Sequence, residues 1–439
     1  MPRPKKQTIL KTEKPVKKKT SFQSPKGMRD ILPQEQAYWD KIEKTARGIA
    51  DFYGFMKIDT PLLESAELFS LTSGEDSDVV SKEMFFVKGR SGGGDFVLRP
   101  EGTAPIARAY LQNGLSHISQ PLKLYYQGPM FRREQPQAGR LRQFHQAGFE
   151  IIGSNSDPIY DAQVIVAMYR ILQDLKIKNI AIQINSIGCR ICRPGYRKKL
   201  IDYYRKHERE LCVDCKERLK VNPLRLLDCK NASCAPFKEK APSLFDNICA
   251  ACSGHLKLVL EYLDELGIIY TLNPILVRGF DYYNKTVFEM FAGEDRLAIA
   301  AGGRYDYLIE MIGGRPAPGV GGALGIERII EVLKRDGIVV TPKQKAKVFI
   351  VYIGDLAKKK TLSLIEEFRK AGIYVRESFG KDLIQRQMQL ANKADAELAI
   401  ILGQKEVYEE TAIIRDLTSG AQESIPLRKV VDEVRRRLK

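Results

Sequence analysis

The sequence predicts an α+β protein, with a first domain built on antiparallel strands and helices and a smaller second domain of the α/β kind. Two apolar runs, residues 122–126 and 149–152, flank a loop containing Pro136 and Gly139, as two antiparallel strands joined by a long loop do. From residue 346 onward, strand-like runs alternate with amphipathic helical segments, which is typical of βαβ units with a mixed sheet. A chain of 439 residues is also too long for one ordinary domain.

The composition is that of a soluble globular protein with an excess of positive charge. Hydrophobic residues make up 44% of the chain, and the formal net charge is +17 with a pI near 9.3. Such a balance favours a polyanionic partner without identifying one. Because the sequence contains neither a long uncharged apolar run nor a signal-peptide core, we expect a cytoplasmic protein without a membrane association.

Changes in composition along the chain indicate where its domains begin and end. Residues 1–21 are rich in Lys, Pro and Thr and have no periodic apolar face, so we expect a disordered basic tail. A non-specific contact with RNA is one use for such a tail. Residues 336–345 have the character of a linker, which gives domains at 22–335 and 346–439, the first with a cysteine-rich insertion at about 189–255.

The N-terminal part of the first domain predicts one long helix and then a hairpin. Apolar residues before Gly54 recur every three or four positions, at Trp39, Ile42, Ala46, Ile49 and Phe52 or Tyr53. Pro33 is acceptable in the opening turn of such a helix. Residues 85–87 and 96–98 flank a glycine-rich turn and predict two paired strands.

The loop between the two central strands has a composition that folding alone does not explain. Arg132 and Arg133 come just before Glu134, and Arg140 and Arg142 lie between Glu134 and Glu150. The planar guanidinium fork matches phosphate oxygens and stays charged at any working pH. These residues indicate a phosphate-binding site, although taken alone they also fit a solvated basic hairpin.

The segments FRRE (131–134) and GRLRQFHQAGFE (139–150) resemble the second signature motif of class II aminoacyl-tRNA synthetases, in the form found in histidyl-tRNA synthetases. The resemblance implies that Arg132 holds the α-phosphate of ATP, that Glu134 belongs to the ATP site, and that the loop approaches the acceptor end of the tRNA. It also implies the class II catalytic core, an antiparallel sheet with flanking helices. The order of helix, strand and Pro61 is similar to the first motif, which in the family forms a homodimer interface.

The segment RPEGTAPIARAY places Glu101 and Thr103 between a strand and a helix. By themselves these residues are explained by helix capping, with Thr103 as the cap and Glu101 as an acid favoured by the helix dipole. In histidyl-tRNA synthetases the similar Glu-Gly-Thr segment contacts the α-amino group of the bound amino acid. The resemblance therefore implies that Glu101, Gly102 and Thr103 bind the ammonium group of histidine, which requires hydrogen-bond acceptors.

Two further segments, LVRGFDYYNKTVFEM (276–290) and AAGGRYDYL (300–308), resemble the signatures that mark histidyl-tRNA synthetases among class II enzymes. We expect the first segment to begin as a strand that delivers its polar residues to one site. An amphipathic strand alone would account for the tyrosines but not for the RGxD pattern. The resemblance implies that Arg278 contacts the substrate carboxylate and the α-phosphate, and that Tyr283 helps to hold the imidazole, with Tyr282 in the same pocket.

The segment VGGALGIERIIEVL supplies small residues and an arginine at the start of a helix, namely Gly321, Gly322, Gly325 and Arg328. Small residues let a backbone approach a flat ring or a phosphate, although the pattern alone also fits close helix packing. In its place it resembles the third class II motif, which implies that Arg328 stacks on adenine and reaches the γ-phosphate. The last domain is similar in pattern to the anticodon-binding domain of the family.

The resemblance as a whole implies a histidine–tRNA ligase, a homodimer whose substrates are L-histidine, ATP with Mg²⁺, and tRNA(His). Histidine selection requires a partner for each ring nitrogen. Glu150 as an acceptor and Tyr283 as a phenol partner suit that role, with Gln146 nearer to the backbone of the amino acid. Because the carboxylate of histidine is itself the nucleophile, Arg132 and Arg278 are the catalytic candidates, as cations that compensate charge at the α-phosphate.

Two alternatives to a synthetase are a non-catalytic regulatory subunit of histidine biosynthesis and a sensor of uncharged tRNA. A regulatory subunit of this kind usually lacks the C-terminal RNA-binding domain. A sensor would tolerate the loss of Arg132, Arg278 or Arg328. Because that domain and all three arginines are present, the sequence favours the enzyme.

All eight cysteines fall between positions 189 and 252, and six of them form CxxC pairs. A CxxC turn places two thiolates on one tetrahedral ion, so eight ligands could serve two structural Zn²⁺ ions. The resemblance to the insertion of the synthetase family implies no metal role, and both outcomes stay open. Disulfides are not expected in a reducing compartment, and a catalytic zinc is disfavoured because the segment offers only His207 and His255.

Overall fold

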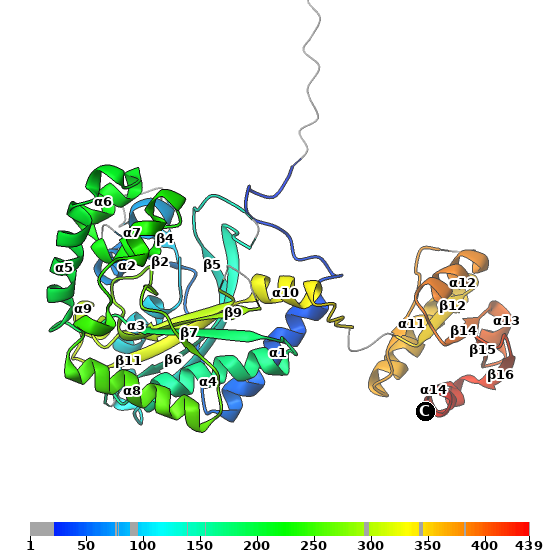
Figure 1. Ribbon diagram of the computed structural model, residues 1–439. Helices are drawn as coiled ribbons and strands as arrows, with labels where there is room; N and C mark the ends of the chain where they lie inside the picture. Colours follow the sequence, from blue (N-terminus) through cyan, green and yellow to red (C-terminus); the bar gives the residue numbers. More distant parts are fainter. Residues whose placement is uncertain are drawn as a thin grey trace, which may run out of the picture. The chain divides into compact units, whose positions relative to one another are not determined.

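The computed structural model divides the chain into two compact units, residues 1–339 and 340–439 (Figure 1). It describes residues 22–438, with gaps at 75–76, 78, 88–94, 138, 154, 294–297, 342–345 and 382. The predicted basic tail, the glycine-rich turn of the predicted hairpin and the last part of the predicted linker lie outside the described residues. No helix among the described residues is long and apolar enough to cross a membrane.

The larger unit is built around one sheet whose strands are β1 (Met56–Lys57), β5 (Leu122–Phe131), β6 (Gln143–Ile152), β7 (Ile180–Ser186), β8 (Thr271–Leu272), β9 (Asn284–Ala292), β10 (Ala300–Arg304) and β11 (Gly319–Gly325). Their order is β1-β5-β6-β11-β10-β9-β7-β8. Only the edge pairs β1–β5 and β7–β8 are parallel, and every other neighbouring pair is antiparallel. The predicted antiparallel sheet is therefore confirmed.

The two central strands are longer than the apolar runs that predicted them. β5 and β6 pair without interruption from Leu122 opposite Ile152 to Phe131 opposite Gln143. The apolar runs stop early because Gln127 and the residues that follow it are partly polar or small. Backbone pairing, which does not depend on side-chain polarity, carries both strands farther.

Four helices pack on one face of this sheet (Figure 1), namely α1 (Gln36–Phe52), α4 (Ile159–Asp174), α8 (Ala250–Glu265) and α10 (Ile326–Arg335). Their apolar residues share one core with the sheet, in which Ile42, Met168 and Val259 are buried together with Phe149 and Phe288. Periodic apolar residues at helical spacing thus form the hidden stripe that the sequence predicted.

The first helix begins later than predicted, and at its other end only one of the two alternative apolar residues faces the core. It begins at Gln36, so Pro33 lies in a turn before the helix and not in its opening turn. At the other end Phe52 is 79% exposed, and Tyr53 packs against the core. A helix turns by about 100° per residue, so only one of these two neighbouring rings can face the sheet.

The other elements of the larger unit include α2 (Ala66–Ser73), α3 (Thr103–Gln112) and α9 (Leu308–Met311). The cysteine-rich insertion contains α5 (Arg193–Arg205), α6 (Val213–Val221), the short 3-10 helix η4 (Pro223–Asp228) and α7 (Ala235–Glu239). A small antiparallel sheet has the order β2 (Leu63–Ser65), β4 (Phe96–Leu98), β3 (Phe85–Val87), which confirms the two strands of the predicted hairpin. Single-turn helices complete the unit: η1 (Val79–Glu83), η2 (Leu115–His117), η3 (Glu208–Glu210), η5 (Ala232–Cys234) and η6 (Phe245–Asn247).

The prediction of a strand at the start of the segment 276–290 is wrong. Residues 276–283 are irregular, and β9 begins only at Asn284. Side chains rather than a strand ladder anchor this stretch, because Arg278 pairs with Glu289 and Asp281 accepts a hydrogen bond from another segment. Polar anchors of this kind have no periodic signature in a sequence.

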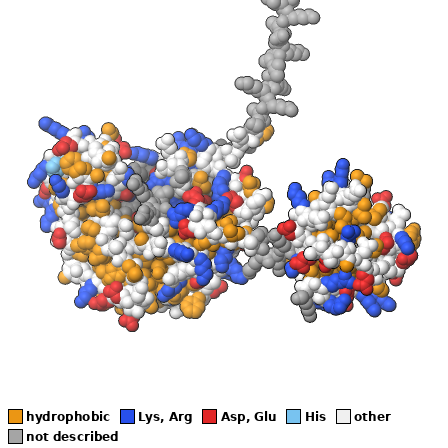
Figure 2. Space-filling model, turned by 45° about the vertical axis from the view of Figure 1, so that its right-hand side comes forward, with side chains coloured by type: hydrophobic (Ala, Val, Ile, Leu, Met, Phe, Trp, Pro, Cys, Tyr) orange, Lys and Arg blue, Asp and Glu red, His pale blue; other side chains and the backbone are white. Residues whose placement is uncertain are grey.

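The smaller unit alternates strands and helices, in the chain order β12 (Val348–Tyr352), α11 (Asp355–Lys370), β13 (Val375–Arg376), α12 (Ile384–Lys393), β14 (Leu398–Leu402), α13 (Gln404–Tyr408), β15 (Thr411–Asp416), β16 (Gln422–Pro426) and α14 (Leu427–Arg437). The sheet order is β13-β12-β14-β15-β16. β12 is parallel to both β13 and β14, whereas β15 and β16 are antiparallel to their neighbours, as the predicted mixed sheet requires. Lys and Arg side chains are spread over the visible surface of both units (Figure 2).

Candidate active site

A cleft of ≈ 1060 Å³ lies in the larger unit, between the ends of β5 and β6, the first turn of α10, the irregular segment before β9 and the cysteine-rich insertion. Its walls include five residues that the sequence singled out: Arg132, Glu134, Gln146, Arg278 and Arg328. These residues come from three segments that are far apart in the chain. The fold thus brings the three predicted arginines to one cavity.

Arg132 follows the end of β5 and holds its guanidinium group between two aromatic rings. Its Cζ lies 5.2 Å from the centre of the Phe144 ring and 5.5 Å from that of the Phe280 ring. Its Nε donates a hydrogen bond to the carbonyl oxygen of Pro100 across 3.0 Å. Among the described residues nothing accepts a hydrogen bond from its two Nη nitrogens, so a fixed pair of donors remains for an anion.

Arg328 and Arg140 bring two more positive charges to the cleft. Arg328 donates to the carbonyl oxygen of Gly139 through Nε, across 2.9 Å, and to that of Ala298 through Nη1, across 2.6 Å. Burial lowers the pKa of Arg328, and the nearby cations Arg140 and Arg132 lower it further. Crowding of like charges is relieved when an anion enters, so this wall of the cleft is suited to phosphate groups.

Carboxylates also line the cleft, and some of them form ion pairs with its arginines. Glu134 accepts a hydrogen bond from Nη1 of Arg140 across 3.3 Å, and Glu289 and Glu331 lie farther along the wall. Mg²⁺ is usually held in nucleotide sites by one or two carboxylates together with the phosphates of the substrate. These three side chains are therefore among the carboxylates of the cleft wall that could approach such an ion.

Arg278 is half-buried in the cleft wall and pairs with the carboxylate of Glu289 in β9. Burial alone would lower the pKa of Arg278, but the Glu289 carboxylate outweighs that effect and the pKa is raised. Its Nε and the Oε1 of Gln146 are buried polar atoms without a partner among the described residues. Such atoms cost free energy until a ligand supplies the missing hydrogen bonds. Sequence reasoning missed Glu289, whose only signal was a lone acid in an apolar run.

Glu150 lies near the end of β6 and is fully buried behind the cleft. Its Oε1 accepts a hydrogen bond from Oγ1 of Thr103 across 2.8 Å, and its Oε2 accepts one from the hydroxyl of Tyr305 across 2.5 Å. Burial raises the pKa of Glu150 to about 8, although both hydrogen bonds oppose the shift. Tyr305 was not among the predicted site residues, and its only signal was its place within AAGGRYDYL.

Glu101, and not Thr103, has the capping role that was the simpler alternative for this pair. The carboxylate of Glu101 accepts hydrogen bonds from the backbone N–H groups of Thr103, across 2.6 Å, and Ala104, across 2.7 Å. Glu101 therefore caps the first turn of α3, and the Thr103 hydroxyl is directed to Glu150 instead. Tyr282 also donates to Glu101 across 3.4 Å, and burial raises the pKa of Glu101.

Two of the predicted glycines make room for buried side chains. A Cβ atom on Gly102 would lie 2.3 Å from Cζ of Tyr126, and a Cβ on Gly321 would lie 1.6 Å from Oε2 of Glu150. The sequence suggested that the glycines before α10 let a ring or a phosphate approach the backbone. Gly321 instead accommodates a side chain of the protein itself, whereas Gly325 does line the cleft.

Tyr282 and Tyr283 lie behind Arg278, with their ring centres 4.6 Å apart. The Cζ of Arg278 lies 5.9 Å from the centre of the Tyr283 ring. Burial raises the pKa of Tyr283 to about 12, so its phenol stays neutral and can donate a hydrogen bond. Six predicted residues therefore form a buried polar layer next to the cleft: Glu101, Gly102, Thr103, Glu150, Tyr282 and Tyr283.

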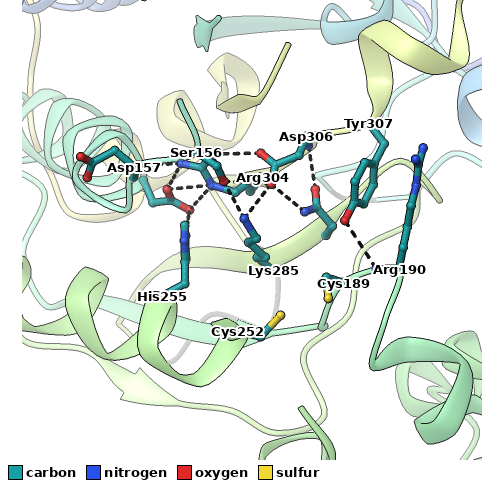
Figure 3. A network of polar contacts seen from close by, with 12 residues as sticks. Ser156, Asp157, Cys189, Arg190, Cys252, His255, Lys285, Arg304, Asp306 and Tyr307 are labelled. Atoms are coloured by element: carbon teal, nitrogen blue, oxygen red, sulfur yellow. Dashed lines mark hydrogen bonds and ion pairs between the residues drawn. The ribbon is translucent and has the colours of Figure 1, made fainter. Parts of the chain in front are cut away.

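A second buried network holds Arg304, the last residue of β10, next to Tyr305 (Figure 3). Arg304 donates to Asp161 through Nε across 2.9 Å and to Asp306 through Nη1 across 3.0 Å. Burial alone would raise the pKa of Asp161, but Arg304 and His255 outweigh it and lower the pKa to about 2. The charged residues of AAGGRYDYL are thus structural, and they fix β10 against α4 and α8.

The eight cysteines form two groups that we call the first tetrad (Cys189, Cys192, Cys249 and Cys252) and the second tetrad (Cys212, Cys215, Cys229 and Cys234). In each tetrad the four sulfur atoms lie within 4.8 Å of one another, so each group could bind a metal ion. The sequence spacing predicted the three CxxC pairs, but it did not predict that Cys229 and Cys234 join Cys212 and Cys215.

Comparison with known proteins accounts for both units. The family model described as Histidyl-tRNA synthetase matches residues 27–193 and 224–329. A histidine–tRNA ligase from Dehalococcoides mccartyi is 44% identical over 419 residues, which cover 95% of this chain and 100% of that protein. The chain belongs to the histidyl-tRNA synthetase family.

Further matches agree with this assignment. The model described as Anticodon binding domain matches residues 347–437. A histidine–tRNA ligase from Pelotomaculum thermopropionicum is 42% identical over 94% of this chain and 97% of that protein. The crystal structure of apo S. aureus histidyl-tRNA synthetase superposes with a TM-score of 0.77 at 32% identity, covering 94% of this chain and 99% of that chain. The predicted class II fold with a C-terminal anticodon-binding domain is confirmed.

One other structural match shows the fold alone. The crystal structure described as an ATP phosphoribosyltransferase regulatory subunit/histidyl-tRNA synthetase from Bacillus halodurans has a TM-score of 0.64 at 23% identity and covers 88% of this chain. A shared histidyl-tRNA synthetase fold therefore does not by itself distinguish an enzyme from a regulatory relative. Site chemistry has to make that distinction.

Proposed function

We propose that this chain is a histidine–tRNA ligase that activates L-histidine with ATP and transfers it to the 3′ end of tRNA(His). One observation carries the proposal, because Arg132, Arg278 and Arg328 come from separate segments and line one cleft beside the buried Glu150. A cavity with several fixed cations next to a buried acceptor suits a triphosphate beside an imidazole. The relatives named histidine–tRNA ligase, at 42% to 44% identity, support the same conclusion.

In the first step, a carboxylate oxygen of histidine attacks the α-phosphorus of ATP, the bond to the β-phosphate oxygen breaks, and pyrophosphate leaves with Mg²⁺. The second step is attack of the terminal ribose hydroxyl of the tRNA on the carbonyl of the adenylate, which releases AMP. Neither step needs a nucleophile from the protein. Catalysis then depends on holding two anions in line and compensating the charge that develops at the α-phosphate.

Arg132 and Arg278 are the groups that we assign to the α-phosphate. The two rings beside Arg132 fix the plane of its guanidinium group, so its free Nη donors are oriented before the substrate arrives. Arg278 carries a buried Nε without a partner, and a phosphate or carboxylate oxygen would satisfy it. Both features lower the reorganisation that the transition state requires.

Arg328 and Glu134 are assigned to the rest of ATP. Arg328 is held by two carbonyl oxygens at the start of a helix, where its planar group can stack on adenine and reach the γ-phosphate. Glu134 pairs with Arg140, and the phosphates of the bound nucleotide would compete with Glu134 for this arginine. Mg²⁺ would accompany the phosphates, as the carboxylates on the cleft wall allow.

The buried polar layer is assigned to histidine. Glu150 would accept a hydrogen bond from one ring nitrogen, and the neutral phenol of Tyr283 would donate one to the other. Glu101 and Thr103 offer oxygens for the ammonium group, with Gly102 and Tyr282 keeping them in place. Gln146 has a buried oxygen without a partner, which suits the amino-acid backbone.

A homodimer is the assembly that we propose. One face of the small sheet β2-β4-β3 carries apolar side chains that are exposed in the single chain, among them Leu63, Val87 and Phe96. A contiguous apolar face of this kind commonly marks a protein contact. The molar mass of the purified chain in light scattering would test whether it is a dimer. We also propose a cytoplasmic location for the enzyme.

The enzyme is favoured over a regulatory relative because the cleft retains the arginines that only the chemistry requires. The test is ATP–pyrophosphate exchange with each of the standard amino acids in turn. We expect exchange that depends on L-histidine and is far weaker with every other amino acid. Exchange driven equally well by a different amino acid, or none with histidine, would contradict the proposal.

A further inference from the structure

The geometry of the two cysteine tetrads fits one metal ion in each. In the first tetrad the Sγ of Cys189 lies 3.8 Å from that of Cys192 and 3.9 Å from that of Cys249, and in the second the Sγ atoms of Cys212 and Cys229 are 3.8 Å apart. Thiolates that bind one Zn²⁺ at about 2.3 Å in tetrahedral geometry lie about 3.8 Å from one another. A disulfide would need sulfur atoms about 2.0 Å apart, so the observed spacing belongs to ligands and not to bonded pairs.

The surroundings of the sulfur atoms favour thiolates. The backbone N–H of Cys189 donates to Sγ of Cys192 across 3.2 Å, and that of Asn231 donates to Sγ of Cys229 across 3.4 Å. Such bonds orient metal ligands and stabilise their charged form. Four sulfur ligands close the coordination shell of Zn²⁺, which is the pattern of a structural site. An iron–sulfur cluster would distribute the four thiolates over two or four irons, and thiolates on different irons would lie farther apart than the sulfur atoms do here.

We propose that the insertion holds two Zn²⁺ ions, one in each tetrad, and that both ions position residues 278–283 without touching the substrate. The tetrads join distant parts of the insertion, since each combines cysteines from separate segments. An ion in each would therefore fix the insertion against the segment that carries Arg278 and Tyr283.

The first tetrad acts on Tyr283 through Arg193, the residue after Cys192. Arg193 donates through Nε to the carbonyl oxygen of Ile187 across 3.2 Å, and through Nη2 to the carbonyl oxygen of Tyr283. An ion that fixes the turn at Cys189 and Cys192 thus fixes the backbone of a histidine-binding residue.

The same ion is linked to the buried network behind the site (Figure 3). Cys252 lies in α8, and His255 one turn later contacts Asp161 across 3.3 Å. Asp161 in turn binds Arg304, whose neighbour Tyr305 holds Glu150. An ion bound by the first tetrad would therefore anchor α8 near His255, through which the helix supports β10.

The second tetrad acts on the other end of the segment. Asp228, the residue before Cys229, forms an ion pair with Arg225 across 3.2 Å, and Asn222 donates to Asp281 across 2.7 Å. Cys212 and Cys229 themselves contribute to the wall of the cleft that Arg132 and Arg328 also line, together with Lys230 and Asn231. Loss of this ion would loosen a wall of the cleft rather than remove a ligand of the substrate.

Metal analysis of the full chain, purified without chelators, tests the sites independently of activity. We expect two zinc ions per chain, one in the variants Cys192→Ser and Cys229→Ser, and two in the controls Ser253→Ala and Val213→Ala, whose exposed side chains neighbour the ligands. Exchange for Co²⁺ should give the intense charge-transfer absorption of a tetrathiolate site. Iron in place of zinc, disulfides, or eight free thiols with no metal after incubation with Zn²⁺ would overturn the proposal.

The wild-type stoichiometry stands even if a cysteine variant fails to fold. The positioning role rests on the proposed function, and Arg193→Lys tests it separately because lysine keeps the charge but loses the guanidinium fork. We expect this variant to retain two zinc ions and to raise the KM for histidine about tenfold with little change in kcat. A lower kcat with an unchanged KM would indicate only a loss of folded enzyme and would contradict the positioning role.

Discussion

The hydroxyl of Tyr305 donates a hydrogen bond to Oε2 of Glu150 across 2.5 Å, and both side chains are buried. Glu150 comes from β6 and Tyr305 from the residue after β10, and β11 lies between these two strands in the sheet. Gly321 of β11 leaves the space that the carboxylate occupies. A carboxylate held in this way offers its remaining lone pairs to an imidazole in one fixed direction.

Replacing Tyr305 by Phe should weaken histidine binding selectively. At a pH above 8, where Glu150 is ionised, the change removes a hydrogen bond to a buried carboxylate, which is worth about 1.5–3 kcal/mol, or roughly a ten- to hundredfold rise in the KM for histidine. The KM for ATP should change little, because Arg132 and Arg328 are untouched. Steady-state exchange kinetics measure both constants, with Tyr262→Phe as a control on α8. Equal changes in the two KM values would argue against the assignment of Tyr305 and Glu150 to histidine.

The raised pKa of Glu150 should appear in the pH dependence of stability. Its pKa is about 8 in the folded chain and 4.5 in a model carboxyl group. Below pH 4.5 both states hold the proton, so its stabilising contribution is complete there. As the pH rises, the unfolded chain loses the proton first, and the contribution is lost by about pH 8.

The variant Glu150→Gln lacks this titration and serves as the reference. Between pH 5 and pH 8 the free energy of unfolding of the wild type should fall more than that of the variant, by on the order of 4 kcal/mol. Urea unfolding followed by the fluorescence of Trp39, the single tryptophan of the chain, reports on the larger unit. Parallel curves for the two proteins would show that Glu150 does not have a raised pKa.

Arg132→Lys should lower the rate of adenylate formation with little effect on folding. Lysine keeps the charge, but it cannot stack between Phe144 and Phe280 or present two fixed donors. We expect kcat for exchange to fall at least about a hundredfold. The neighbouring Arg133→Lys is the matched control, since Arg133 is exposed and exchange does not involve tRNA. A control variant as slow as Arg132→Lys would remove the special role of Arg132.

The pair Arg278–Glu289 allows catalysis and stability to be separated. Arg278→Ala leaves the half-buried Glu289 carboxylate unpaired on the cleft wall, which should destabilise the chain by about 1–3 kcal/mol. Adding Glu289→Gln to Arg278→Ala removes the unpaired charge and should restore most of the melting temperature. Exchange should stay undetectable in both proteins. Recovery of exchange together with the melting temperature would assign Arg278 a structural role alone.

The sequence predicted much of the fold because its main elements carry local patterns. Helices such as α1 and α4 show apolar residues at helical spacing, and the strands β3 and β4 coincide with their apolar runs. The irregular segment 276–283 was predicted wrongly as a strand, since side-chain anchors from other elements determine its path.

The arginines of the cleft were found from motifs, whereas their partners were not. Tyr305 and Glu150 are 155 positions apart in the sequence, and Arg278 pairs with Glu289 only because the segment before β9 turns back on the strand. Contacts of this kind depend on strand order and on register, which a single sequence does not specify. Hence the buried layer behind the cleft was predicted by residue type and could be assembled only from the structure.

A crystal structure with a non-hydrolysable analogue of histidyl-adenylate tests most directly whether the three arginines and the buried layer form one site. We expect the phosphate-like group within hydrogen-bond distance of both Arg132 and Arg278, the adenine against Arg328, and the imidazole between Glu150 and Tyr283. An analogue bound elsewhere, or bound here with its imidazole in solvent, would contradict the proposed function.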